Sequence, residues 1–436
     1  MSVASLFSQT PTQRVSLAET ELALEQLVAG GGAGSTRACS FTLILYLPAE
    51  EQQLLSALGW YAGPIDAVAG DETRTALSRA QAALGLPVTG QADEATLTAL
   101  RQSLAARDGA KATLDRRSAV FTERIARQHP CRLILICPQL LGSPEITAEV
   151  SAYRPAEDGD GDGLLYCETI VLRGRQDAFR EVGPELLRLK RPGLPLYLYW
   201  EAEATPNHPL LASLLPSCQL LMVDSATVAA PSQEFRRYHE LQEQGTAIAD
   251  LNWLRLAAWQ ELTAAAYDPP QRRLGLGAID RVAIDYERGN NGLALLFLGW
   301  LANRLGWEPR WQQRLGGDYD LRRFGLDGAD GRSVEAELGS LPVGESGDVV
   351  GELVGIRLSS TDERVDCGTL LCSETTGCMH METGGRAQQL YTETVSPEHD
   401  RTSEELLARQ LQQATGDPLY AETLGTTVAL IETASG

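Results

Sequence analysis

The sequence predicts an α/β protein with a small all-α module near its N-terminus and a β-rich α+β region at its C-terminus. From residue 129 onward, long apolar runs typical of buried strands alternate with amphipathic runs typical of helices. Residues 49–105 contain three helical repeats separated by Gly- and Pro-containing turns. Beyond Trp311, short alternating strands dominate. We therefore expect four segments, at residues 1–48, 49–105, 106–310 and 311–436.

The composition is typical of a soluble globular protein and disfavours several kinds of partner. The 436 residues include 37 basic and 58 acidic side chains, which gives a formal net charge of −21. This negative charge disfavours binding to nucleic acid or to an anionic membrane. The longest apolar run, residues 293–302, is shorter than the ~20 residues of a membrane-spanning helix. Because the N-terminus also has no basic and apolar leader, we expect a cytoplasmic protein.

The first two segments contain a linker and then a compact helical unit. Residues 30–35 are mostly glycine and are typical of a flexible linker, and residues 41–48 read as a strand. Three helices follow, beginning near residues 49, 71 and 93; we expect Asp71 to cap the second of them and Asp93 to start the third. The helices are separated by the turns that contain Gly63-Pro64 and Gly85-Leu86-Pro87.

This helical unit resembles the peptidoglycan-binding-like family of three-helix domains. The resemblance rests on GWYAGPIDAVAG (59–70), TRTALSRAQ (73–81), GLPVTG (85–90) and DEATLTAL (93–100). Ala69 and Ala80 stand where this family usually has aromatic residues, so a surface for stacking sugar rings is missing from the pattern. A small module for protein contacts is the alternative to a peptidoglycan-binding function.

The remainder of the chain supplies the expected sheet and its covering helices. Strands are expected at 132–138, 146–153, 167–174, 194–200, 219–225 and 281–287, with helices at 176–189, 233–245, 251–267 and 292–305. The C-terminal region is expected to close with a helix at 403–414 and a last strand at 426–431.

No motif indicates catalysis or a cofactor. The acidic turn at 158–163 lacks the glutamate that calcium loops carry at position twelve, which is Thr169 here. The spacings of phosphate-binding glycine loops and of the G-x-S-x-G nucleophile turn are absent. The five histidines include no H-E-x-x-H pair. We therefore expect a protein with no catalytic residue, no cofactor and no resident metal.

The cysteines fall into two groups. Five are spread along the chain, several of them in apolar runs, and most are expected to be buried thiols: Cys39, Cys131, Cys137, Cys167 and Cys218. Cys367, Cys372 and Cys378 crowd into twelve residues, next to His380. Three alternatives remain open for this cluster: a redox pair across the turn CSETTGC, inert thiols, or a zinc site formed by the three cysteines and His380.

One helix carries large side chains of the kind found at interfaces. Trp253, Arg255 and Trp259 lie in DLNWLRLAAWQEL (250–262), and Asp250 is the expected N-cap. Tryptophan and arginine are frequent anchors of protein interfaces. The helix is therefore a candidate for partner contact, and packing in the core is the alternative.

The motifs of the α/β region, taken in order, resemble one family. They are HPCRLILICP (129–138), AEVSAY (148–153), CETIVLRG (167–174), LPLYLYW (194–200), MVDS (222–225) and DLNWLRLAAWQEL (250–262). Together they resemble the glucose-6-phosphate dehydrogenase assembly proteins, the OpcA family, in the cyanobacterial form that carries a peptidoglycan-binding-like domain. Ala257-Ala258 departs from the Thr-Pro that many members have before the second tryptophan.

The resemblance implies a non-catalytic function. Members of this family bind glucose-6-phosphate dehydrogenase, favour its active oligomer and so feed the oxidative pentose phosphate pathway. In cyanobacteria the oxidised form is effective, and reduction by thioredoxin switches it off. Carried over, the resemblance implies a regulatory disulfide between Cys372 and Cys378, with Cys367 as an alternative thiol. A peptidoglycan-binding protein and a zinc-binding protein remain the alternatives.

Overall fold

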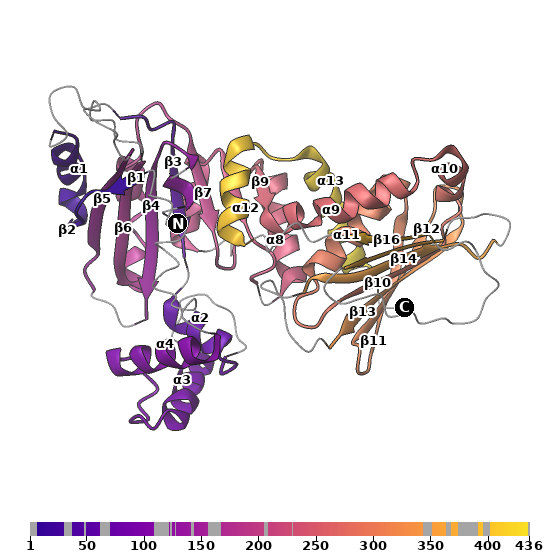
Figure 1. Ribbon diagram of the computed structural model, residues 1–436, viewed down its shortest axis with the longest axis horizontal. Coiled ribbons are helices and arrows are strands. Elements are labelled where there is room, and N and C mark those ends of the chain that lie inside the picture. The colour runs from indigo at the N-terminus through magenta and orange to yellow at the C-terminus, as the bar shows by residue number, and fades with distance from the viewer. Residues whose placement is uncertain are drawn as a thin grey trace, which may run out of the picture. The chain divides into compact units, whose positions relative to one another are not determined.

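The computed structural model comprises two compact units. The first contains residues 1–223 and 407–415, and the second contains residues 224–406 and 416–436. The structure describes residues 7–29, 37–47, 49–61, 70–108, 122, 124–126, 128–140, 144–155, 167–204, 208–228, 230–342, 351–362, 368–373, 391–395 and 402–434. The fold is mixed α/β with two mixed sheets, and the predicted α/β class is confirmed at this level (Figure 1). The four predicted segment boundaries stay predictions.

The sheet of the first unit has a parallel centre and an antiparallel edge. Its order is β1-β5-β6-β4-β3-β7-β8, and β2 also pairs with β5. The strands β3, β4, β6, β7 and β8 run parallel, whereas β5 is antiparallel to β6. The bounds are β1 (Phe7–Gln9), β2 (Gln13–Ser16), β3 (Phe41–Tyr46), β4 (Cys131–Gln139), β5 (Thr147–Pro155), β6 (Cys167–Arg175), β7 (Leu196–Trp200) and β8 (Leu220–Val223). The five parallel strands thus have the spatial order 3-2-1-4-5, which is that of a doubly wound sheet.

The helices of the first unit include three that share a core of their own. They are α2 (Glu50–Ala57), α3 (Asp71–Ala83) and α4 (Glu94–Asp108). Leu54, Leu77 and Leu100 are among the buried residues of this cluster. Asp93 accepts a hydrogen bond from the Thr96 backbone (2.8 Å) at the start of α4. The predicted cap of α3 is wrong, because Gly70 rather than Asp71 is its N-cap. The other helices are α1 (Thr20–Ala29), α6 (Gly183–Arg188) and α7 (Pro209–Leu214).

The sheet of the second unit has seven strands in the order β11-β12-β13-β10-β14-β15-β16. The pairs β10–β13 and β15–β16 are parallel, and the other pairs are antiparallel. The bounds are β10 (Arg281–Glu287), β11 (Glu308–Gly316), β12 (Leu321–Asp327), β13 (Ser333–Leu341), β14 (Leu353–Ser359), β15 (Thr369–Ser373) and β16 (Tyr391–Val395). A further short strand, β9 (Ile248–Asp250), leads into a helix of this unit.

Helices lie along one side of the second sheet (Figure 1). They are α8 (Pro231–Glu243), α9 (Leu251–Ala266), α10 (Pro270–Leu276), α11 (Gly292–Leu305) and α13 (Pro418–Glu432), and α12 (Ser403–Gln410) begins in this unit. The helix α11 is buried along most of its length, and it packs on α13. A Cβ at Gly299 would lie 2.0 Å from the Thr427 hydroxyl oxygen, so this helix pair requires a glycine there.

The long apolar elements confirm the sequence prediction, and the end of the chain corrects it. The strands predicted at 132–138, 146–153, 167–174 and 281–287 correspond to β4, β5, β6 and β10. The strand predicted at 426–431 is wrong, because these residues belong to α13. The Asp417 side chain caps that helix by accepting a hydrogen bond from the Leu419 backbone, and Pro418 occupies its first turn.

A buried ion pair joins neighbouring strands of the first sheet. Arg132 on β4 lies opposite Glu168 on β6, its Nε is 2.7 Å from Glu168 Oε2, and both side chains are almost fully buried. Arg132 also donates to the Leu189 carbonyl (2.6 Å) and contacts Glu21, while Arg37 reaches the second oxygen of Glu168 (2.8 Å). Burial alone would lower the pKa of Arg132, but the carboxylates outweigh it and the pKa is raised.

The substitution Glu168→Gln tests this pair. It removes the buried partner of Arg132 and leaves only the partly exposed Glu21, so we expect a loss of about 3–5 kcal/mol in the free energy of unfolding, measured with urea. Asp177→Asn is the matched control, because Asp177 pairs with Arg175 at the surface of the same unit and its loss should cost far less than the loss of Glu168. Equal losses for the two variants would contradict the assignment.

Candidate functional site

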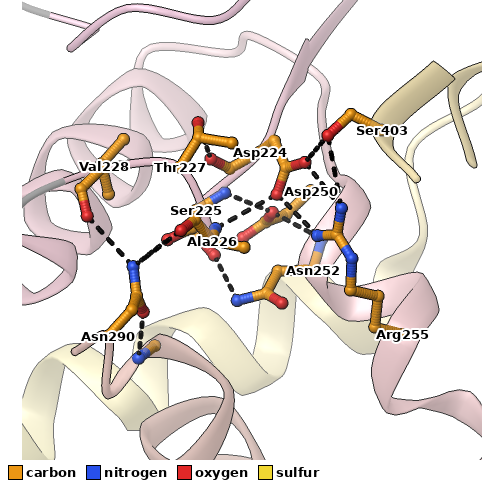
Figure 2. Close-up of polar contacts among 11 residues, drawn as sticks. Asp224, Ser225, Ala226, Thr227, Val228, Asp250, Asn252, Arg255, Asn290 and Ser403 are labelled. Atoms are coloured by element: carbon orange, nitrogen blue, oxygen red, sulfur yellow. Dashed lines mark hydrogen bonds and ion pairs between the residues drawn. The ribbon is translucent and has the colours of Figure 1, made fainter. Parts of the chain in front are cut away.

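The loop that follows β8 begins with a buried carboxylate, Asp224. Both of its oxygens accept hydrogen bonds from the Arg255 guanidinium on α9, at 2.6 and 2.8 Å. Ser403, the first residue of α12, donates its hydroxyl to Asp224 Oδ2 (2.7 Å). Figure 2 shows these three side chains converging from separate elements. The bidentate geometry fixes α9 and the start of α12 against the loop.

The charge on Asp224 is maintained by its partners. Burial opposes ionisation of this carboxyl, but the Arg255 charge and the hydrogen bonds from Arg255, Ser403 and the Ala226 backbone outweigh burial, so the pKa of Asp224 lies below its ordinary value. The stability contributed by this ionisation is therefore present above about pH 4, the ordinary pKa of Asp, and is lost as the pH falls through the lowered pKa of the folded state.

A second buried carboxyl, Asp250, lies near Asp224, and its pKa is shifted in the opposite direction. Its Oδ1 accepts hydrogen bonds from the backbone N–H groups of Ser225 (3.0 Å) and Asn252 (2.9 Å), so it is the N-cap of α9, as predicted. Asn252 in turn donates its side-chain amide to the Ser225 hydroxyl (3.1 Å). Burial, together with the nearby charge of Asp224, raises the pKa of Asp250 to about 6 despite these hydrogen bonds.

A buried asparagine completes the network. The Asn290 side-chain amide donates to the carbonyl oxygens of Ser225, Ala226 and Val228, at 3.0 to 3.1 Å. Its own oxygen accepts from the backbone of Gly292, the first residue of α11 (2.7 Å). One amide thus holds the carbonyl groups of the 224–228 loop and the start of a helix together (Figure 2).

The chemistry of this network is that of a clamp. The Arg255 guanidinium and the Asp224 carboxylate form a bidentate pair, and Asp250 and Asn290 form hydrogen bonds to backbone groups that they position. We call the set Asp224, Asp250, Asn252, Arg255, Asn290 and Ser403 the carboxylate clamp. It joins the 224–228 loop to the starts of α9, α11 and α12.

The three residues proposed for partner contact are buried in the second unit. Trp253 and Trp259 are each 6% exposed, and the Trp253 ring nitrogen donates to Asp417 (2.8 Å) while its ring lies against Tyr420. Arg255 belongs to the carboxylate clamp. These contacts favour the core-packing alternative for these side chains, and a partner would have to reach α9 through its other residues.

Of the redox cluster, only Cys372 lies in the described part of the chain. It is on β15, between β14 and β16, it is buried, and it is disulfide-bonded. The other described cysteines are free thiols, and Cys367, Cys378 and His380 lie outside the described residues. The helix α9, which carries Arg255, packs on β15 and β16. Within the described ranges no group of side chains could hold a metal ion.

The free thiols of the first unit are poorly suited to exchange. Burial raises the pKa of Cys39 and of Cys218 to about 12, and the pKa of Cys131 well above its ordinary value. Cys131 and Cys167 lie opposite each other on β4 and β6 with their sulfur atoms 3.7 Å apart. Since the thiolate is the reacting form, Cys39, Cys131 and Cys218 are expected to be inert at neutral pH.

In the sheet of the first unit, the strand order reverses between β3 and β7. In doubly wound sheets a ligand binds in the crevice at this point. Here the last residues of the two strands, Tyr46 and Trp200, are directly paired, and their rings stack at 4.0 Å and 13°. The His208 ring lies edge-on to both, and the two stacked rings are at most 1% exposed. Side chains of the chain itself therefore occupy the crevice.

The helix after β3 also lacks the features of a phosphate site. In dinucleotide-binding folds a glycine-rich turn and a helix N-terminus receive the pyrophosphate at this place. The helix α2 instead begins with Glu50 and Glu51. Glu51 is buried, accepts a hydrogen bond from the Leu140 backbone (3.3 Å), and has its pKa raised by burial to about 7. A buried carboxyl group here supplies no positive charge for a phosphate group.

Asp250→Asn tests the electrostatics of the carboxylate clamp. The unfolded chain ionises Asp250 near its ordinary value of 3.8, whereas the folded protein keeps the proton to about pH 6. The native protein therefore loses stability from this group as the pH rises from about 4 to 6, by roughly 3 kcal/mol. Asparagine retains the capping oxygen without the charge, so the free energy of unfolding of the variant should not fall between pH 4 and 6.

The measurement is urea unfolding of both proteins between pH 4 and 8. We expect the variant to gain stability relative to the natural chain across that window and to keep a constant advantage above it. Parallel stability curves for the two proteins would show that Asp250 does not titrate in this range.

Family models match three parts of the chain. Residues 122–240 match the family described as the N-terminal domain of a glucose-6-phosphate dehydrogenase subunit, and residues 246–424 match the family described as its C-terminal domain. Residues 49–100 match "Putative peptidoglycan binding domain". Among solved structures, a probable dehydrogenase from Thermotoga maritima has a TM-score of 0.36 at 12% identity and covers 60% of this chain and 86% of its own. A likeness this weak carries no argument.

Curated relatives match over nearly the full length. A protein of Synechococcus elongatus named "Putative OxPP cycle protein OpcA" is 47% identical over 95% of each chain. Proteins of the same name from Nostoc punctiforme and Synechocystis sp. are 42% and 39% identical, over 100% and 92% of this chain and 97% and 87% of their own. This chain therefore belongs to the OpcA family of OxPP cycle proteins.

Proposed function

We propose that this protein is a non-catalytic effector that binds glucose-6-phosphate dehydrogenase, favours its active oligomer and raises its activity in the oxidative pentose phosphate pathway. The family descriptions, which name that dehydrogenase, support this partner. The relatives, named as OxPP cycle proteins, support the pathway. We also propose a cytoplasmic location; no helix in the described part of the chain is long and apolar enough to cross a membrane.

The observation that carries the effector role is the filled crevice of the first sheet. A dehydrogenase of doubly wound topology needs this crevice for its dinucleotide. Tyr46, Trp200 and His208 fill it with a stack whose burial stabilises the fold, and opening it would expose two large aromatic rings. Glu51 occupies a place where a pyrophosphate would need positive groups, and it supplies none. Both features support a binding protein rather than an enzyme.

An effector raises activity only by binding the active state of its partner more tightly than the inactive state. The difference between the two binding free energies sets the largest shift in the population of active enzyme. A binding surface that is already ordered loses less entropy on association, so a cross-link near that surface increases affinity.

We propose a disulfide between Cys372 and Cys378 as the regulatory element, with Cys367 as the alternative partner. The disulfide-bonded state of Cys372 and its place on β15, next to α9, support this assignment. The dithiol of thioredoxin would supply two electrons and two protons, which convert the disulfide to two thiols here while thioredoxin becomes the disulfide. Reduction then releases the restraint on the chain around β15.

We further propose that residues 49–105 act as a three-helix module for protein contacts. Ala80 is fully buried in the shared core of α2, α3 and α4, so this position offers no surface for a sugar ring; Ala69 lies outside the described residues. Peptidoglycan binding, which the match to residues 49–100 suggests, is tested by a pull-down on purified cell wall. Retention of the protein there would favour that alternative.

The test of the function is dehydrogenase activity as a function of glucose 6-phosphate concentration. We expect the oxidised protein to lower the apparent KM, and the protein reduced by thioredoxin to have no effect. Cys372→Ser and Cys378→Ser should behave like the reduced form, whereas Cys367→Ser should respond like the natural chain. Cys218→Ala is the control, because Cys218 is a free thiol of the first unit.

Two results would contradict the proposal at different points. An unchanged KM with both redox forms, together with no binding in sedimentation, would reject the effector role. Equal activation by the oxidised and reduced forms would retain the effector role and reject the switch.

A further inference from the structure

The second unit contains a cavity of about 810 Å³ that the proposed function does not use. It lies at the carboxyl ends of the parallel strands β10 and β13, where Tyr286 and Ser340 line it. The first turns of α8 supply another wall, and the turn between β11 and β12 supplies a third. Its size is that of a site for a small molecule, for which 300–1,000 Å³ is the usual range.

Two arginines that line this cavity keep hydrogen-bond donors for a ligand. Arg236 on α8 lies 3.3 Å from Glu432 and contacts the Ser232 carbonyl. Arg288, which follows β10, is exposed and donates to the carbonyl oxygen of Asp318 rather than to a carboxylate. A guanidinium group has five N–H donors, so both side chains keep donors for a further acceptor.

A third arginine adds positive charge on the same side of the sheet. Arg322 on β12 is paired with Leu338 on β13. Ser340 lies two residues further along β13 and is paired with Tyr286 on β10. Directly paired and alternate residues share a face, so Arg322 lies on the face that carries Tyr286 and Ser340. Within the described ranges Arg322 forms no ion pair, and burial is the main cause that lowers its pKa.

The carboxylates nearby do not cancel this charge. Asp320 is engaged by Arg314 through two hydrogen bonds, at 2.8 and 3.0 Å. Asp318 is exposed at the mouth of the cavity. In a chain with a net charge of −21, a cavity that two arginines line, with a third on the same face of the sheet, is a local site for an anion. The positive end of the α8 dipole also faces this wall.

We propose that this cavity binds a small phosphorylated polyol, such as a sugar phosphate. The phosphate group binds to Arg236 and Arg288, which suit its geometry. Gln233, Asn291 and the Asp318 carboxylate, all in the lining, supply hydrogen bonds to the hydroxyl groups of the ligand. The predominantly polar lining is unsuited to an apolar ligand.

Calorimetric titration of the full-length chain tests this site, with glucose 6-phosphate, glycerol 3-phosphate, inorganic phosphate and glucose as probes. We expect the two phosphate esters to bind more tightly than inorganic phosphate, and glucose to give no heat. Arg288→Gln and Arg236→Gln should each weaken ester binding about tenfold or more. Arg310→Gln is the matched control, because Arg310 pairs with Asp327 on the same sheet and does not line the cavity.

The failures are distinguishable from one another and from failure of the proposed function. No binding of any phosphate, or equal binding by the natural chain and both cavity variants, would overturn the site. Equal affinity for inorganic phosphate and for the esters would overturn the proposal that the site recognises the hydroxyl groups of a polyol. Since Arg288 is exposed, an unchanged melting temperature of its variant separates lost binding from lost folding. The titration needs neither the dehydrogenase nor the disulfide.

Discussion

The buried pair of Asp224 and Arg255 is the interaction on which the arrangement of the second unit depends. A carboxylate at the end of a strand, removed from water, requires a cation with matching geometry, and α9 is placed so that its arginine supplies it. Once α9 is fixed, Trp253 meets Asp417 and Tyr420, and the helix lies on β15 and β16. Ser403 and Asn290 attach two further helix starts to the same loop. Removal of either member would leave the other charge buried without its partner, which is strongly destabilising.

The same pair also positions the helix that packs on the strand of Cys372. Cys372 belongs to a strand that α9 covers, and α9 is anchored at its first turns by Asp250 and Arg255. Reduction of the disulfide at Cys372 would therefore act on α9 through its contacts with β15. In the first unit, the stacked Tyr46 and Trp200 rings lie at the place that a ligand takes in other doubly wound sheets.

The sequence predicts the elements better than it predicts the clamp. Strands such as β4 and β6 and the helix α11 are long apolar runs, and their type follows from their periodicity. The last helix escapes prediction because Thr426, Thr427 and Val428 are β-branched, and its cap lies nine residues earlier, at Asp417. Asp224, Asn290 and Ser403 meet only in the fold, and each one alone resembles an ordinary polar loop residue. The one local signal is the acid directly after an apolar strand, in MVDS. The filled crevice depends on strand order, which no local pattern contains.

The insertion of α2, α3 and α4 between two neighbouring strands has a consequence for how the first unit folds. The strands β3 and β4 pair side by side, yet residues 47–130 separate them in the chain. Closing a long loop costs entropy before any strand contact is gained, and such distant pairings form slowly. The three helices have a core built from near neighbours in sequence. By folding early they shorten the effective loop and bring the ends of β3 and β4 within reach, so the module contributes to the assembly of the sheet whatever it binds afterwards.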